Sequence, residues 1–245
     1  MIRTDDADGV RVVSLARPDR RNALTPEGLD ALEDAIAAAD ADATADGSAD
    51  ADTAPSVLYI RGDGPAFCAG ADLDVVANLS REEAETFAEQ GQRVANAIES
   101  AECVVVAGID GPARGGGVEL ALACDLRVAT PGATFAEPGV ELGLFGAWGG
   151  TARLPRIVGE GEALDLALSG RTIDAETALR MGLVSRVTDD PRAVADEIAG
   201  NDSETLRAIK SRVRDRSSVA DQQAREVETF GRLVARNAER IADRR

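Results

Sequence analysis

Apolar and polar residues alternate along the chain in blocks that predict strands separated by helices. Five apolar segments have the length and composition of β-strands: residues 10–15, 57–62, 103–109, 126–130 and the short stretch Thr134–Phe135. Helical patterns are expected over residues 27–39, 80–99, 116–124, 150–157 and 160–168, the first opened by Pro26 after an N-cap at Thr25. This order indicates an α/β architecture with crossover connections.

Two stretches depart from this regular order. Residues 39–56, ADADATADGSADADTAPS, have no apolar periodicity, and their composition predicts a solvated acidic loop inside one domain. From residue 190 to residue 245 the pattern is helical and strongly charged. We therefore expect a core over residues 1–189 and a C-terminal helical segment over residues 190–245 that packs on a neighbouring subunit.

The charge balance bears on the habitat of the protein. The formal net charge is −17, and Lys210 is the one lysine among 27 basic residues. Self-repulsion of this size destabilises a compact state in dilute salt, whereas molar salt shortens the Debye length to about 3 Å and screens the charges. Because the acidic residues are spread along the whole chain, the sequence favours a protein of a halophilic archaeon over a mesophilic protein with an acidic partner-binding face. Nucleic acid is not an expected ligand.

Membrane and disulfide-bonded classes are not expected. No apolar run reaches the about 18 residues of a membrane-spanning helix. The first residues, MIRTDDADGV, lack the basic start and apolar core of a signal peptide, so a cytoplasmic location is expected. Cys68, Cys103 and Cys124 are odd in number and show no C-x-x-C spacing, which favours buried thiols.

The chain contains no histidine, and this limits its chemistry. Ser-His-Asp, Cys-His and His-metal sites are all excluded. We expect no metal site. Acid–base chemistry is left to carboxylates, tyrosine, cysteine or Lys210.

Glycine-rich turns follow two of the predicted strands. GPAFCAGADL (residues 64–73) comes after the strand at 57–62, and GPARGGGVEL (residues 111–120) comes after the strand at 103–109. Small residues let a ligand approach the backbone, and a helix N-terminus leaves amide N–H groups without partners. Two such turns, each with a flanking acidic residue, indicate a site that binds an oxyanion.

These turns belong to a set of motifs by which the chain resembles the crotonase-fold, or enoyl-CoA hydratase/isomerase, superfamily. In the family's order they are RPDRRNALT (17–25), AFCAGADL (66–73), GPARGGGVELALACDLRVA (111–129), GGTARLPRIVG (149–159) and ALSGRTIDAETALRMGLVSRV (167–187). The resemblance implies a crotonase (ClpP-like) spiral of β-β-α units with a C-terminal helical segment, assembled as a homotrimer or a dimer of trimers. It also implies an acyl-CoA thioester substrate, with coenzyme A as part of that substrate and no separate cofactor.

The resemblance assigns roles to residues by position. The N–H groups of Ala71 and Gly116 would form an oxyanion hole for the thioester carbonyl, and Glu119 would be an acid–base carboxylate. The alternative for Glu119 is a carboxylate that only complements the helix dipole. The residues expected to line the substrate and CoA channel are Ala23, Leu24, Ala69, Asp72, Leu73 and Gly115. Arg17, Arg20 or Arg21 would lie near the CoA phosphates or remain an exposed loop charge.

Gly139 marks the main departure from the family pattern. The family's second acid–base glutamate lies in a PExxLG context, and the matching position in FAEPGVELGLFGAWGG (135–150) is Gly139. Glu137 and Glu141 flank it, but a shift of two residues along extended backbone moves a side chain about 6–7 Å. We therefore expect both to be solvated or structural. For Trp148, a wall of the acyl pocket and a core-filling role remain open.

The expected function is an acyl-CoA enzyme that stabilises a thioester enolate, with 2-enoyl-CoA hydratase in fatty-acid or related acyl-CoA metabolism as the first choice. Isomerase, decarboxylase or another one-carboxylate reaction is the alternative within the family. A non-catalytic acyl-CoA-binding paralogue is the alternative outside catalysis. With Glu119 as the one acid–base group, hydration of crotonyl-CoA is expected to be weak.

Overall fold

The structure, a computed structural model, describes residues 1–44 and 55–243. The chain forms two compact units, Met1–Gly200 and Asn201–Arg245. The boundary expected from the sequence, after residue 189, lies one helix before the boundary between these units. The difference is α8 (Pro191–Ala199), which packs on strands of the first unit. The trimerisation role of the C-terminal segment stays a prediction.

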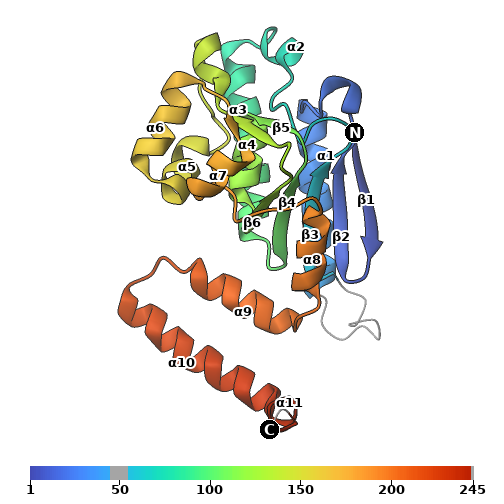
Figure 1. The fold of residues 1–245 in the computed structure, drawn as a ribbon, viewed down its shortest axis with the longest axis vertical. Helices are drawn as coiled ribbons and strands as arrows, with labels where there is room; N and C mark the ends of the chain where they lie inside the picture. Colours follow the sequence, from blue (N-terminus) through green and yellow to red (C-terminus); the bar gives the residue numbers. More distant parts are fainter. Residues whose placement is uncertain (45–54, 244–245) are drawn as a thin grey trace. The chain divides into compact units, whose positions relative to one another are not determined.

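A mixed six-stranded sheet forms the centre of the first unit (Figure 1). In spatial order its strands are β1 (Ile2–Ala7), β2 (Val10–Leu15), β3 (Val57–Gly62), β4 (Val104–Ile109), β6 (Leu126–Ala129) and β9 (Arg186–Val187). β1 runs antiparallel to β2, and the other neighbouring pairs are parallel. The predicted α/β class is confirmed, as are the strands predicted at β2, β3, β4 and β6, whereas β1 and β9 have no counterpart in the sequence predictions.

A smaller sheet brings the two glycine-rich turns together. It contains β5 (Pro112–Arg114), β7 (Thr134–Ala136) and β8 (Ile173–Asp174), with β7 parallel to β5 and antiparallel to β8. An isolated bridge joins Cys68 to Ala113, and the Arg114 N–H donates to the Cys68 oxygen at 2.9 Å. The turns at 64–73 and 111–120 therefore lie side by side, as an oxyanion site built from both requires.

The helices of the first unit follow the predicted periodicity, with additions in the loops. Besides α8 they are α1 (Pro26–Thr44), α2 (Leu73–Val76), α3 (Arg81–Ser100), α4 (Gly116–Ala123), α5 (Gly150–Val158), α6 (Glu160–Ser169), α7 (Ala175–Arg180) and the 3-10 helices η1 (Pro18–Arg20) and η2 (Pro138–Leu142). α1 continues to Thr44 because alanine, the best helix former, recurs there, and Ala39 and Ala43 are buried. Residues 39–44 of the segment expected to be an acidic loop are therefore helical, and residues 45–54 lie outside the described part of the chain.

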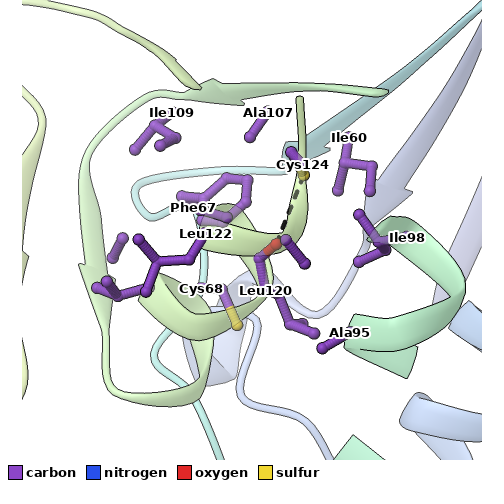
Figure 2. Packing of buried hydrophobic residues seen from close by; sticks show 14 of the residues in the cluster. Ile60, Phe67, Cys68, Ala95, Ile98, Ala107, Ile109, Leu120, Leu122 and Cys124 are labelled. Carbon is purple, nitrogen blue, oxygen red and sulfur yellow. Dashed lines mark hydrogen bonds between the residues drawn. The ribbon is translucent and has the colours of Figure 1, made fainter. Parts of the chain in front are cut away.

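The core of the first unit lies between the main sheet and the helices α1, α3 and α4. All six residues of β4 are buried, which is typical of a parallel strand covered on both faces. Figure 2 shows Phe67 from the first glycine-rich turn and Leu122 from α4 among these buried side chains, together with Ile109 of β4. The core thus extends directly beneath the turns.

The three cysteines are buried thiols, as predicted. The Cys124 thiol donates to the Leu120 oxygen at 3.5 Å (Figure 2), and the Cys68 thiol donates to the Asn22 oxygen at 3.2 Å. Burial raises the pKa of Cys68 to about 12, so this thiol stays protonated and is not a nucleophile at neutral pH.

The second unit is helical, with α9 (Ser203–Val213), α10 (Val219–Arg236) and α11 (Ala238–Ala242). α9 and α10 form a hairpin (Figure 1) whose groove is lined by apolar side chains. Val213, Val227 and Phe230 in this groove are 70–75% exposed. No helix in the described part of the chain is both long and apolar enough to cross a membrane.

Candidate active site

A cavity of about 310 Å³ opens where the glycine-rich turns meet α3, α4 and the segment 137–148. The predicted site residues on its wall are Ala69, Ala71, Leu73, Gly115, Gly116, Glu119, Gly139 and Trp148. Ala23, Leu24 and Asp72, which the sequence also predicts to line the channel, lie outside this wall. All three are buried, and Leu24 pairs with Ala71 of the turn at 64–73.

The N–H groups of Ala71 and Gly116 have no hydrogen-bond acceptor among the described residues. Leu24 pairs with the residues on either side of Ala71: its N–H donates to the Gly70 oxygen and its oxygen accepts from the Asp72 N–H, both at 2.8 Å. The Ala71 N–H therefore points away from this pairing. Gly116 is the first residue of α4, where amide N–H groups have no partner within the helix. The two donors are placed to stabilise a carbonyl oxygen on which negative charge develops.

The three glycines that open α4 each have a separate steric reason. Gly115 holds a φ of +46°, a conformation that side chains rarely adopt. A Cβ on Gly116 would lie 2.2 Å from a ring carbon of Trp148, and a Cβ on Gly117 would lie 2.4 Å from the Cys68 carbonyl oxygen. The close approach of the indole ring and of the neighbouring turn requires glycine here.

Asp72, near the end of the turn at 64–73, is buried and forms ion pairs with two arginines. It is 3% exposed, and it accepts hydrogen bonds from Arg17 at 2.6 Å and from Arg20 at 3.3 Å. Burial would raise its pKa, but Arg17, the Asp74 N–H and Arg20 hold the pKa below its ordinary value. The charges of Arg17 and Arg20 are therefore paired with the Asp72 carboxylate. Arg21, the third arginine of this loop, is exposed and forms no ion pair with a described residue.

Glu119 is buried in the cavity wall, and the opposite loop holds its carboxyl group. Its Oε1 accepts hydrogen bonds from the Trp148 N–H at 2.9 Å and from the Gly150 N–H at 2.7 Å. Burial raises the pKa of Glu119, while the two N–H groups and the nearby Arg153 act in the opposite direction. Because the carboxyl is bonded to another segment and lines the cavity, complementing the dipole of its own helix does not account for its position.

Arg153 fixes the loop that holds Glu119. This guanidinium is 7% exposed and donates to Glu99 Oε2 at 2.9 Å, to Asn96 Oδ1 at 2.8 Å and to the Trp148 oxygen at 3.4 Å. It thereby joins α5 to α3 and to the peptide group of Trp148. The two N–H donors to Glu119 are held in place by this network.

Trp148 serves both of the roles left open by the sequence. Its ring is 4% exposed and meets the ring of Phe87 edge-on, with centroids 5.6 Å apart. Both aromatic residues also line the cavity. Trp148 is therefore a core side chain whose accessible edge forms part of the wall of the pocket.

Glu137 was expected to be either solvated or structural, and the structure excludes the solvated alternative. Glu137 is 8% exposed and lines the cavity, and its Oε1 is buried without a hydrogen-bond partner in the described structure. Burial, and secondly the charge of Glu119, raise the pKa of Glu137 to about 9. Glu141, by contrast, is exposed on η2, as expected.

A second cavity, of about 360 Å³, lies on the other side of Glu137, between η2, α5 and α6. Apart from Glu137 and Glu160, its wall is largely apolar, and it shares Phe145 and Gly146 with the first cavity. Glu137 thus stands between two spaces that can hold ligand or water. Within the described residues no group of three or more Cys, Asp or Glu side chains has the arrangement of a metal site.

Comparisons with known proteins agree with this geometry. The family model described as enoyl-CoA hydratase/isomerase matches residues 5–233. A crotonyl-CoA hydratase of Syntrophomonas wolfei is 40% identical over 188 residues, which are 76% of this chain and 68% of that protein. A short-chain-enoyl-CoA hydratase of Clostridium acetobutylicum is 35% identical over 193 residues, covering 78% of this chain and 70% of the relative.

Solved structures extend the similarity to the three-dimensional fold. The crystal structure of an enoyl-CoA hydratase from Bacillus anthracis has a TM-score of 0.86 and 29% sequence identity, and the match covers 98% of this chain and 96% of that one. The predicted crotonase fold is thereby confirmed. On the family model over residues 5–233 and on these relatives and structures, the chain belongs to the enoyl-CoA hydratase/isomerase family.

Proposed function

We propose that this protein adds water to short 2-enoyl-CoA thioesters, as a hydro-lyase of fatty-acid or related acyl-CoA metabolism. The observation that carries the proposal is a single cavity that combines the unpaired N–H groups of Ala71 and Gly116 with the buried carboxyl of Glu119. The hydratases among its relatives bear out hydratase-type acyl-CoA chemistry. The reaction needs no cofactor beyond the coenzyme A of the substrate.

The site can perform this reaction by polarising the thioester. The carbonyl oxygen accepts hydrogen bonds from the Ala71 and Gly116 N–H groups, and each such donor contributes on the order of 3 kcal/mol as the enolate forms. Glu119 accepts a proton from the water molecule whose oxygen attacks the β-carbon. Trp148 and Phe87 shield the reacting atoms from bulk water.

Gly139 favours a second candidate function. Because it stands where the family carries its second acid–base glutamate, isomerisation, decarboxylation or another one-carboxylate reaction competes with hydration as the main activity. A non-catalytic acyl-CoA-binding protein would perform none of these reactions.

A panel of saturated and unsaturated acyl-CoAs, incubated with the purified protein in D₂O at high salt and analysed by mass, tests the proposal. We expect crotonyl-CoA to gain the mass of heavy water and saturated thioesters to exchange protons at the α-carbon. Shifts of the double bond without hydration would support the second candidate. Binding without any mass change would rule out both.

We further propose that the protein works in the cytoplasm of a halophilic archaeon as a homotrimer or a dimer of trimers. The net charge of −17 and the exposed apolar groove between α9 and α10 support this proposal. We expect the melting temperature to rise strongly between 0.1 M and about 2 M KCl, and oligomers to dissociate at low salt, because the subunits repel one another. Calorimetry and light scattering across this range provide the check, and an unchanged melting temperature would count against a halophilic protein.

Replacing Gly139 by glutamate is expected not to increase the rate of crotonyl-CoA hydration. The φ of Gly139 lies outside the left-handed region, but a Cβ there would meet the Leu144 carbonyl group at 3.0–3.1 Å and Phe145 Cα at 3.1 Å. The segment after η2 must therefore shift, which lowers the melting temperature and leaves crotonyl-CoA hydration unchanged or slower. A several-fold rise in turnover with an unchanged melting temperature would show that the loop accepts the family's arrangement.

A further inference from the structure

Glu137 is a buried acid for which the mechanism above has no role. Glu137 is only 8% exposed, and its Oε1 has no hydrogen-bond partner among the described residues. Native proteins pair most buried polar atoms, because an unpaired one reduces stability. Glu137 also lines the cavity that contains Glu119. An unpaired acid in that position indicates a bond that is made when the cavity is filled.

The charges around Glu137 favour its neutral form. Glu119 on α4 repels a negative charge on it, and Glu160 on α6 lines the second cavity with it. α5 also lines the second cavity, but its buried Arg153 donates to Glu99 and to the Trp148 oxygen. Glu119, in contrast, receives two backbone N–H bonds that favour its charged form. The environment separates the two carboxyls into one that ionises first and one that keeps its proton.

We propose that Glu137 is the second catalytic carboxyl of this site and donates its proton to the α-carbon of the enoyl thioester. This rests on the proposed function and replaces the single-carboxylate account. Glu137 would take over, from a different position in the chain, the task of the glutamate that the family carries where this chain has Gly139.

The proposed step balances without a further reactant. The water oxygen bonds to the β-carbon, and its proton passes to the Glu119 carboxylate. The π electron pair moves to the thioester enolate and then forms the new bond between the α-carbon and the Glu137 proton. Glu119 is left protonated and Glu137 ionised, and one proton transfer between them restores the starting state. The sum is one water added across one double bond.

Glu137→Gln is the first test, because glutamine matches the neutral acid in size and cannot give up a proton. We expect the turnover of crotonyl-CoA hydration to fall by about 10²–10⁴-fold, with KM changed by less than a few-fold. Deuterium exchange at the α-carbon of butyryl-CoA is expected to fall by a similar factor. Exchange needs the ionised form of Glu137, because only a carboxylate can remove the α-proton. Glu119→Gln is therefore expected to reduce hydration, to exchange more slowly than wild type at pH 7, and to exchange faster as the pH rises towards 9.

Glu141→Gln is the matched control, since the same substitution is made on η2 at an exposed carboxylate. It is expected to behave as wild type in both reactions. If the wild type hydrates crotonyl-CoA and Glu137→Gln does so equally well, the inference is wrong while the proposed function stands. If the wild type neither hydrates crotonyl-CoA nor exchanges α-protons, the proposed function itself fails.

A stability measurement tests the protonation state of Glu137 without using activity. An acid whose pKa rises from 4.5 in the unfolded chain to about 9 in the folded one makes the protein less stable as the pH rises through that window. Glu137→Gln removes this loss, so its melting temperature should exceed that of wild type by an amount that grows from pH 5 to pH 8. Glu141→Gln should show no such trend. A difference that stays constant with pH would mean that Glu137 is ionised in the folded protein, and would overturn the proposal.

Discussion

Replacing Glu119 by glutamine is expected to lower the turnover of crotonyl-CoA hydration by about 10²–10⁴-fold, the usual contribution of a positioned acid–base group. The glutamine oxygen can still accept hydrogen bonds from the N–H groups of Trp148 and Gly150, whose nitrogens lie 2.9 Å and 2.7 Å from Glu119 Oε1. The loop therefore keeps its path, and the affinity for crotonyl-CoA should stay within a few-fold of wild type. Steady-state kinetics together with calorimetric binding measure the two effects separately.

Glu119→Ala provides the comparison that separates chemistry from loop support. It removes the acceptor for both N–H groups, so we expect weaker binding and a lower melting temperature in addition to the loss of turnover. A glutamine variant that hydrates crotonyl-CoA at the wild-type rate would show that Glu119 is only a structural carboxylate of the first helical turn.

The second large effect is expected from Gly116→Ala. The added methyl group would lie 2.2 Å from a ring carbon of Trp148, so the ring and the start of α4 must move apart. Displacing an oxyanion-hole donor costs about 10²–10³-fold in turnover. Overpacking a buried contact costs about 1–3 kcal/mol of the free energy of unfolding. Turnover numbers and thermal melts of the variant measure both losses.

Gly132→Ala is the control for this substitution. Gly132 lies in the turn before β7, its φ is not in the left-handed region, and a Cβ there would have no heavy atom within 4 Å. We expect wild-type turnover and melting temperature. If Gly116→Ala behaves in the same way, then the Gly116 N–H does not depend on the position of the Trp148 ring, and the assignment of the oxyanion hole needs revision.

The strands that could be predicted from the sequence are mostly buried or half-buried, and β4 is the clearest case. β4 is a continuous apolar run because helices cover both of its sides, and such a run is visible without any structure. β1, Ile2–Ala7, reads IRTDDA and is almost wholly exposed at the edge of the sheet. Its pairing depends on backbone hydrogen bonds to β2 and not on side-chain burial, so apolar periodicity carries no signal for it.

A site that binds an oxyanion could be predicted at the two glycine-rich turns because such a site depends on local backbone chemistry. A helix start leaves N–H groups without partners wherever it occurs, and Gly116 opens α4 in this way. The choice of Ala71 as the second donor rests on the resemblance to the family. The environment of a side chain depends on packing between distant segments. The N–H groups of Trp148 and Gly150 donate hydrogen bonds to Glu119 from 29 and 31 residues further along the chain. No local sequence pattern predicts that contact.

The burial of Glu137 in the cavity wall was not predicted, for a specific geometric reason. The sequence argument assumed extended backbone, in which a shift of two residues moves a side chain by about 6–7 Å. In the structure the chain enters the 3-10 helix η2 directly after Glu137, and such a helix rises only about 2.0 Å per residue. The position two residues before the family's glutamate is therefore close enough to reach the same cavity.

The most direct test of the central claim is the infrared spectrum of a bound thioester carbonyl. Crotonyl-CoA with an isotope-labelled carbonyl, bound to Glu119→Gln so that the substrate persists, reports the polarisation of that one bond. We expect the carbonyl stretch to shift to lower frequency on binding, and to shift less when Gly116→Ala is added. A stretch that remains at its solution frequency would contradict an oxyanion hole at Ala71 and Gly116, and with it the catalytic role proposed for this cavity.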